Sequence, residues 1–188
     1  MSGDICVMGL GNVLMGDDGL GPSVLARLQA GYDFAPGVAL LDAGTPGQDL
    51  TLFLEGLRAL VVVDALEARG APGEVRTYRK EDLLRHALPQ VTSPHEPSLR
   101  EALLRLELLG NGPHEVLLVG AIPERVETGG GLSGPLRRAL PELEALVLQE
   151  LARLGAPATA RSDASPPDLW WEPLPAHPVH RVPPGGRS

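Results

Sequence analysis

Short apolar runs, rich in β-branched residues, recur along the chain between segments with helical spacing. Unbroken apolar runs are typical of parallel strands covered on both faces, because neither face meets water. Four such runs lie at residues 5–8, 38–41, 59–63 and 116–122. Residues 74–79 instead alternate polar and apolar side chains, which predicts a half-exposed strand at the edge of a sheet.

Three segments place leucine or valine every three or four positions, which is the spacing of one helix face. They are Leu20, Val24, Leu25 and Leu28, then Leu99, Leu103, Leu106 and Leu109, then Leu136, Leu140, Leu143, Val147, Leu151 and Leu154. Gly31 is expected to end the first helix, and Pro141 to kink the last without dividing it. The element order predicts an α/β fold, a three-layer αβα sandwich with a mostly parallel twisted sheet of about five strands.

The composition changes near residue 155. The chain has 188 residues, which suits one domain, and residues 156–188 hold eight prolines and almost no periodicity. We predict a domain over residues 1–155 and a proline-rich C-terminal tail over residues 156–188 that is extended or disordered in isolation. Trp170 and Trp171 lie in this tail. They are expected to tie it to the domain, with docking of a partner as the alternative.

The chain is acidic, with 24 acidic against 16 basic residues and a formal net charge of −8. This charge disfavours binding to nucleic acid or to an anionic membrane. No apolar run approaches the roughly 20 residues of a membrane span, and no secretory signal is evident, so the expected location is cytoplasmic. The single cysteine, Cys6, excludes an internal disulfide and an all-cysteine zinc site, and is expected in the core.

Glycines and acids follow the predicted strands where each strand finishes. They are Gly9, Gly11, Asp17, Asp18, Asp42, Gly44, Gly47, Asp64 and Glu124, and Asn12 and Pro123 lie among them. In parallel sheets flanked by helices, ligands bind beyond the carboxyl ends of the strands. The sequence therefore predicts a functional site at that edge of the sheet.

The first of these turns, GLGNVLMGDDGLG, partly matches a dinucleotide-binding loop. Such a loop needs a third glycine where Leu14 stands, and its acids would repel a pyrophosphate, so nucleotide binding is disfavoured, as is a methyltransferase-type loop. Pro22 suits the first turn of a helix. Asp17 is expected to cap that helix, which leaves Asp18 free to point elsewhere.

Three residues combine into a candidate metal-binding set. Asp64 follows three valines and is interpreted as a carboxylate aimed into the ligand crevice; a turn-forming role, which Asp42 also fits, is the alternative. His95 lies in SPHEP, where prolines on both sides restrict it, and a rigid ligand loses less entropy on binding. Asp18, Asp64 and His95 would offer oxygen and nitrogen ligands suited to nickel, zinc or another borderline divalent ion.

The segments GLGNVLMGDDGLG, DAGTPG, VVVDA, SPH, VGAIPE and GLS resemble the hydrogenase maturation proteases, peptidase family M52, over roughly residues 5–154. The resemblance implies a peptidase that removes a short C-terminal extension from the large-subunit precursor of a nickel–iron hydrogenase. It also implies action after nickel insertion, with the precursor's nickel as the recognition element. The family's metal-contacting acid, strand-end aspartate and loop histidine correspond to Asp18, Asp64 and His95. The family often has glutamate at the position of Asp18 and glycine at that of Ala43.

The reaction chemistry follows from the same three residues. No Ser-His-Asp or Cys-His arrangement is evident, and Ser93 is too close in sequence to His95 to suggest a nucleophile pair. We expect Asp18, Asp64 and His95 to engage the precursor's nickel, so that the ion, or a water held by it or by a carboxylate, assists hydrolysis. A paired-aspartate mechanism is the alternative.

Two other functions fit the sequence. A non-catalytic nickel-binding maturation chaperone would bind nickel tightly and cleave nothing. A peptidase of the same fold with another protein substrate would leave the hydrogenase precursor intact. Incubation with a nickel-loaded precursor separates these functions from the maturation protease.

Overall fold

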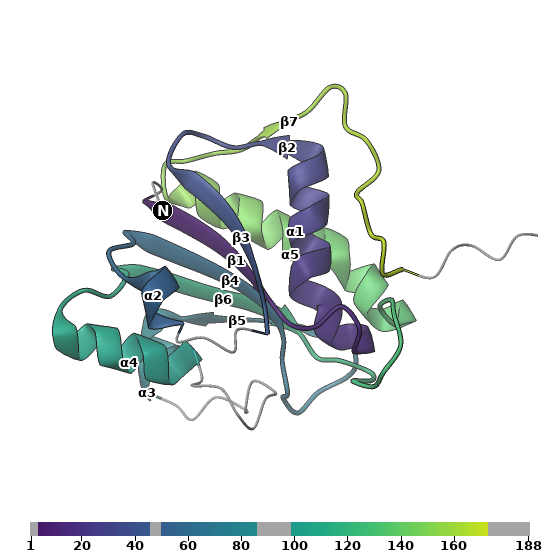
Figure 1. Ribbon diagram of the computed structural model, residues 1–188, viewed down its shortest axis with the longest axis horizontal. Helices are drawn as coiled ribbons and strands as arrows, with labels where there is room; N and C mark the ends of the chain where they lie inside the picture. Colours follow the sequence, from purple (N-terminus) through teal and green to yellow (C-terminus); the bar gives the residue numbers. More distant parts are fainter. Residues whose placement is uncertain (1–3, 46–49, 86–98, 173–188) are drawn as a thin grey trace, which may run out of the picture.

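The computed structural model describes residues 4–45, 50–85 and 99–172. Its centre is a five-stranded sheet in the order β3-β1-β4-β6-β5 (Figure 1). The strands are β1 (Ile5–Leu10), β3 (Val38–Gly44), β4 (Ala59–Ala65), β5 (Val75–Arg79) and β6 (Glu115–Ala121). Four of them are parallel, and β5 pairs antiparallel with β6 at one edge. The mostly parallel sheet and its edge strand are therefore as predicted.

Helices cover both faces of the sheet (Figure 1). The helices on one face are α1 (Leu20–Gly31) and α5 (Gly134–Arg153), and those on the other are α2 (Thr51–Leu54), α3 (Lys80–Arg85) and α4 (Leu99–Leu109). Successive side chains of a strand point to opposite faces, so the central strands feed two apolar clusters. In β4, Val61 and Val63 pack with α1 and α5, whereas Leu60 and Val62 pack with α2 and α4. This arrangement confirms the three-layer sandwich.

The helical spacing predicted the buried faces with one exception. All the predicted apolar positions of the first and last helices are buried, α1 ends at Gly31, and α5 continues through Pro141 as one helix. Leu109 was expected on the buried face of α4 but is 65% exposed. The reason is that α4 ends there, and Gly110 turns the chain with a φ of 71°, a conformation that favours glycine.

The start of α1 lies directly against the carboxyl ends of β1 and β4. Gly21 has no side chain at this contact, and a Cβ atom there would be 2.5 Å from the Val63 carbonyl oxygen. The 3-10 turn η1 (Gly16–Gly19) immediately precedes α1 and packs beside β4. The close approach of α1 to the sheet therefore carries the acids of η1 to the end of β4.

The described part of the C-terminal segment runs along the domain. β7 (Thr159–Ala160) pairs antiparallel with β2 (Tyr32–Asp33) to form a small second sheet. The sequence did not predict this strand, because two residues carry no periodicity. Trp171 donates from Nε1 to Ser23 Oγ at 3.4 Å, as expected for a residue that ties the segment down. Trp170 is 68% exposed, so the expectation that it also ties the segment to the domain was wrong. Residues 173–188 lie outside the described residues.

Two further expectations concern features away from the site. Cys6 is fully buried in β1, and burial raises the pKa of its thiol to about 11, so it is an unreactive core side chain as expected. Within the described ranges, no helix combines the length and the apolar character that a membrane crossing needs.

Candidate active site

Two buried acids approach each other at the carboxyl edge of the sheet. Asp18 lies in η1 and is 8% exposed, and Asp64 is the next-to-last residue of β4 and is 2% exposed. The negative charge of Asp18 raises the pKa of Asp64, so the two carboxyl groups interact electrostatically. The structure thus brings together two of the three residues that the sequence singled out.

The turn after β1 holds the Asp18 carboxyl group. Its Oδ2 atom accepts the backbone N–H of Asn12 at 2.8 Å. Gly11 makes this turn possible, because its φ is 120° and a Cβ atom there would collide with the Asp18 carbonyl oxygen. Burial raises the pKa of Asp18, and the hydrogen bond from Asn12 offsets part of the rise. The backbone therefore fixes one oxygen of this carboxyl group in a partly dehydrated setting.

Asp64 is the more strongly perturbed acid. Its Oδ1 atom accepts the backbone N–H of Ala65 at 2.7 Å, whereas its Oδ2 atom is buried without a hydrogen-bond partner among the described residues. Burial, and then the charge of Asp18, raise the pKa of Asp64 to about 8 despite the bond from Ala65. A buried oxygen without a partner is costly, so Oδ2 is suited to a proton, a cation or a donor from beyond the described residues.

The acid pair can work in two ways. Two neighbouring carboxyl groups can share one proton, as in paired-carboxyl hydrolysis, because both cannot ionise cheaply side by side. They can also bind one divalent cation, whose charge removes the repulsion between Asp18 and Asp64. Both uses place a reacting group at the edge of the sheet where ligands of α/β folds bind.

The expectation that Asp17 caps α1 was wrong. The N-cap position of α1 is Gly19, and no side chain caps that helix. The Asp17 carboxylate instead reaches the segment before α5, where Oδ2 accepts the N–H groups of Glu124 and Arg125 and Oδ1 accepts that of Ser133 at 2.6 Å. Asp17 therefore accepts hydrogen bonds at the N-terminus of α5 and not at that of α1. A negative charge is favourable at the N-terminus of any helix, so the charge of Asp17 also suits α5.

Replacing Asp17 by alanine should lower the free energy of unfolding by about 3 kcal/mol, because three backbone donors then lose their acceptor in a buried site. Thermal unfolding monitored by circular dichroism measures the loss. Asp163→Ala is the control, since it removes an exposed acid, and it should unfold as the wild type does. A change below about 1 kcal/mol in Asp17→Ala would show that Asp17 does not hold the segment before α5.

Asp42 has the turn-forming role that its glycine-rich surroundings suggested. Its Oδ1 atom accepts the N–H of Gly44 at 3.0 Å. The carbonyl of Gly44 in turn accepts the N–H of Gly11 at 2.9 Å. The end of β3 therefore supports the turn that carries Asp18, and Asp42 acts on backbone geometry.

His95 lies outside the described residues, so its place beside the two acids stays a prediction. Among residues 4–45, 50–85 and 99–172, no three histidine, cysteine, aspartate or glutamate side chains converge in the way that a metal site needs. Asp18 and Asp64 form a pair in that part of the chain, and a third ligand has to come from elsewhere.

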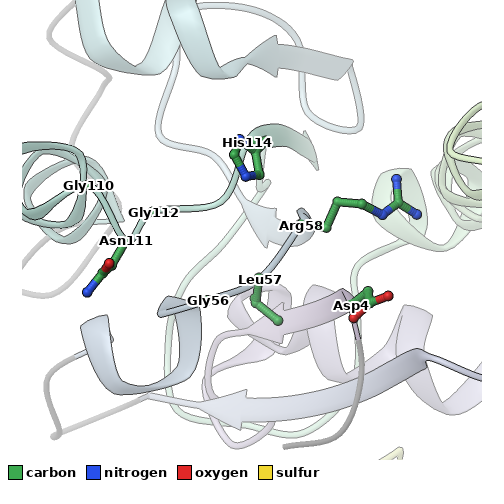
Figure 2. A pocket seen from close by; sticks show the side chains of 8 residues that line it. All are labelled: Asp4, Gly56, Leu57, Arg58, Gly110, Asn111, Gly112 and His114. Atoms are coloured by element: carbon green, nitrogen blue, oxygen red, sulfur yellow. The ribbon is translucent and has the colours of Figure 1, made fainter.

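A pocket of about 450 Å³ lies at the other end of the strands (Figure 2). It is lined by Asp4, Gly56, Leu57, Arg58, Gly110, Asn111, Gly112 and His114. These residues lie at or before the amino ends of β1, β4 and β6, opposite the edge that carries the acid pair. The Arg58 side chain donates to the Leu154 carbonyl at 3.2 Å instead of closing the pocket. The acid pair, Asp18 and Asp64, lies at the edge where ligands of α/β folds bind, and it is the candidate active site.

Comparisons with known proteins find one family. A model of the family described as "Hydrogenase maturation protease" (HycI) matches residues 22–150. The "Hydrogenase expression/formation protein HoxM" of Azotobacter vinelandii is 33% identical over 159 residues, which cover 84% of this chain and 77% of that protein. The "Hydrogenase 2 maturation protease" of Escherichia coli is 30% identical over 158 residues, which cover 84% of this chain and 96% of that protein.

Solved structures agree with the sequence matches. The hydrogenase maturating endopeptidase HybD of Escherichia coli has a TM-score of 0.76 at 31% identity, covering 85% of this chain and 98% of that chain. The maturation protease HycI of Thermococcus kodakarensis has a TM-score of 0.60 at 26% identity, covering 79% and 92%. The protein is thus a peptidase built on an α/β sandwich. It belongs to the hydrogenase maturation protease family, as the sequence resemblance predicted.

Proposed function

We propose that this protease removes a short C-terminal extension from the large-subunit precursor of a nickel–iron hydrogenase after nickel has been inserted. Family membership supports the hydrogenase as the target. The observation that carries the proposal is the Oδ2 atom of Asp64, which is buried and has no hydrogen-bond partner among residues 4–45, 50–85 and 99–172, so that it suits a cation brought by the substrate. Nickel is then part of the substrate and its recognition element. We place the reaction in the cytoplasm, as expected for a sequence without an evident secretory signal.

In this proposal, Asp18, Asp64 and His95 engage the precursor's nickel and so hold the scissile bond at the acid pair. Two carboxylates and an imidazole are ligands that divalent nickel accepts. Holding the reactants together removes much of the entropic cost of reaction. A water held by the ion or by a carboxylate then attacks the peptide carbonyl. Because the pKa of Asp64 is about 8, nickel has to displace a proton from this carboxyl group.

A paired-aspartate reaction is the second candidate mechanism. The raised pKa of Asp64 favours it, since a neutral Asp64 beside an ionised Asp18 resembles two carboxyl groups that share one proton. This mechanism needs no nickel and therefore predicts cleavage of nickel-free precursor. A non-catalytic nickel chaperone predicts nickel binding with no cleavage of either precursor.

Replacing His95 by alanine should reduce cleavage of nickel-loaded precursor by at least about 100-fold, because the docking set loses its nitrogen ligand. The release of the extension is measured by mass spectrometry of the large subunit. His114→Ala is the matched control, since His114 is an exposed histidine at the opposite end of the sheet. It should cleave at the wild-type rate.

The same assay with nickel-free precursor separates the candidates. The proposal expects wild-type enzyme to cleave the nickel-loaded form alone. Wild-type rates in His95→Ala would remove nickel docking, and equal cleavage of both precursors would favour the paired-aspartate reaction. Absence of cleavage from the loaded precursor would overturn the proposed function.

A further inference from the structure

The chain after α5 crosses the outside of α1 and returns to the N-terminal ends of α1 and α5 (Figure 1). Its near end is fastened beside the C-terminus of α1, where the N–H of Arg161 donates to the Gly31 carbonyl at 2.9 Å and its Nε atom pairs with Asp33 at 2.7 Å. From there the segment runs to Glu172. These contacts show that a part of the chain beyond residue 150, where the match to the family ends, is built onto the domain.

The far end of this segment grips the loop before α5. Glu172 accepts the backbone N–H of Leu132 through Oε1 at 3.1 Å and pairs with Arg137 through Oε2 at 2.5 Å. Arg137 also contacts Leu132, because its Nε atom donates to the Leu132 carbonyl at 2.8 Å. The carbonyl of Trp171 lies so close to Gly130 that a Cβ atom at Gly130 would collide with it. Both peptide groups of Leu132 are therefore held by side chains.

The same loop is held on its inner side by the residue next to Asp18. The N–H of Ser133, which follows Leu132, donates to Asp17 Oδ1 at 2.6 Å. Two backbone hydrogen bonds add to this contact. The N–H of Asp17 donates to the Arg125 carbonyl, and the N–H of Gly16 donates to the Gly129 carbonyl. The turn that carries Asp18 and the loop gripped by Glu172 are thus parts of one hydrogen-bonded unit.

A second line of contacts joins the segment to the acid turn. Trp171 donates from its indole nitrogen to Ser23 Oγ, and Ser23 Oγ donates to the Gly19 carbonyl at 2.7 Å. Gly19 is the residue after Asp18. The C-terminal segment therefore meets the acid turn from two directions, through the loop and through α1.

We propose that Glu172 is a positioning residue of the protease: it fixes the loop at Leu132 and Ser133, and through Asp17 it holds Asp18 in its working position. The inference rests on the proposed function for its catalytic half. Misplacement of a catalytic group by about 1 Å can cost roughly 100-fold in rate, so a residue that touches no substrate can still govern turnover. A role in position changes kcat more than KM, since docking by the other ligands persists.

The test compares three variants of the full chain. Glu172→Ala removes both contacts of the carboxylate. Glu172→Gln keeps an acceptor for the Leu132 N–H but loses the charge that faces Arg137. Asp168→Ala is the matched control, because it removes an exposed acid from the same segment. Cleavage of nickel-loaded precursor gives kcat and KM, and hydrogen exchange followed by NMR gives the protection of the Leu132 and Ser133 amides.

Glu172→Ala should lower kcat about 10-fold with KM within about twofold, and should speed exchange at both amides about 10-fold. Glu172→Gln should keep most of the wild-type kcat and most of the protection of the two amides. Asp168→Ala should match the wild type in both. Unchanged exchange in Glu172→Ala overturns the grip on the loop, and faster exchange with an unchanged kcat overturns the positioning role. If the wild-type enzyme leaves the precursor intact, the proposed function is overturned, and so is the effect of Glu172 on catalysis. The exchange rates of the Leu132 and Ser133 amides still decide whether Glu172 holds the loop.

Discussion

Replacing Asp64 by asparagine is expected to reduce processing by about 1000-fold and, at neutral pH, to stabilise the folded protein. Under the two proposed mechanisms, the catalytic loss follows because an amide can neither ionise to bind the precursor's nickel nor share a proton with Asp18. The gain in stability follows because Asp64 is buried beside another acid, and one of its oxygens has no hydrogen-bond partner in the part of the chain that the structure describes. Asparagine nearly matches the shape of the neutral carboxyl group and carries no charge to bury.

The sign of the pH dependence comes from the pKa of Asp64. Its folded-state pKa is raised from 3.8 to about 8, so between these values folding takes up a proton. Its contribution to stability is therefore fully present below about pH 4 and is lost as the pH rises to about 8. The asparagine variant lacks this loss. The two proteins should have similar free energies of unfolding near pH 4, and that of the variant should be higher by about 2–4 kcal/mol at pH 8.

Denaturant unfolding of both proteins at several pH values between 4 and 9 measures this difference. Asp163→Asn, which replaces an exposed acid, controls for the general change in charge. A stability gap that stays constant with pH would mean that Asp64 is ionised in the folded protein. Processing at more than a tenth of the wild-type rate would remove Asp64 from the reaction, whatever its effect on stability.

Replacing Gly21 by alanine is expected to destabilise the protein by about 3 kcal/mol or more. A Cβ atom at Gly21 would stand 2.5 Å from the Val63 carbonyl oxygen and 2.6 Å from the backbone nitrogen of Leu10. These atoms belong to two central strands, so neither can move aside cheaply. Relief of the clash has to push α1 away from the sheet, which separates η1, and with it Asp18, from Asp64.

Gly31→Ala provides the control within the same helix. No atom of the described residues lies within 4 Å of a Cβ built at Gly31, so alanine there should be neutral or stabilising by up to about 1 kcal/mol. Thermal unfolding should place Gly21→Ala at least about 6 °C below the wild type and Gly31→Ala at or above it. Equal melting temperatures for the two variants would show that the contact between α1 and the sheet is looser than described.

The acid pair shows how far local patterns reach into a site. Asp64 was singled out because it directly follows a strand that is apolar on both faces, and Asp18 because two adjacent acids exceed what one helix cap uses. Both arguments depend on the residue and its immediate neighbours. The strand order then brings the two acids to the same edge, since β1 and β4 are adjacent and parallel. His95 depends equally on local sequence, and its position stays a prediction.

Asp17 shows where such reasoning fails. The local sequence offered α1 as the nearest helix, and the cap was assigned there. Its true partners, Glu124, Arg125 and Ser133, lie more than 100 residues further along the chain. The sequence did indicate that the adjacent acids Asp17 and Asp18 have different roles, one in the backbone and one in the site. Which acid served which task depended on the folded neighbours.

The amino-acid sequence alone determined the five strands of the central sheet, the main helices, the sandwich and the edge of the sheet where the acids gather. It could do so because periodicity and strand-end chemistry are local properties that burial then enforces. Only the tertiary structure decided that one oxygen of Asp64 is buried with no hydrogen-bond partner among the described residues, and that Glu172 reaches Leu132. Those features depend on how packed elements exclude water and on contacts between distant segments, and neither is encoded in any one stretch of the chain.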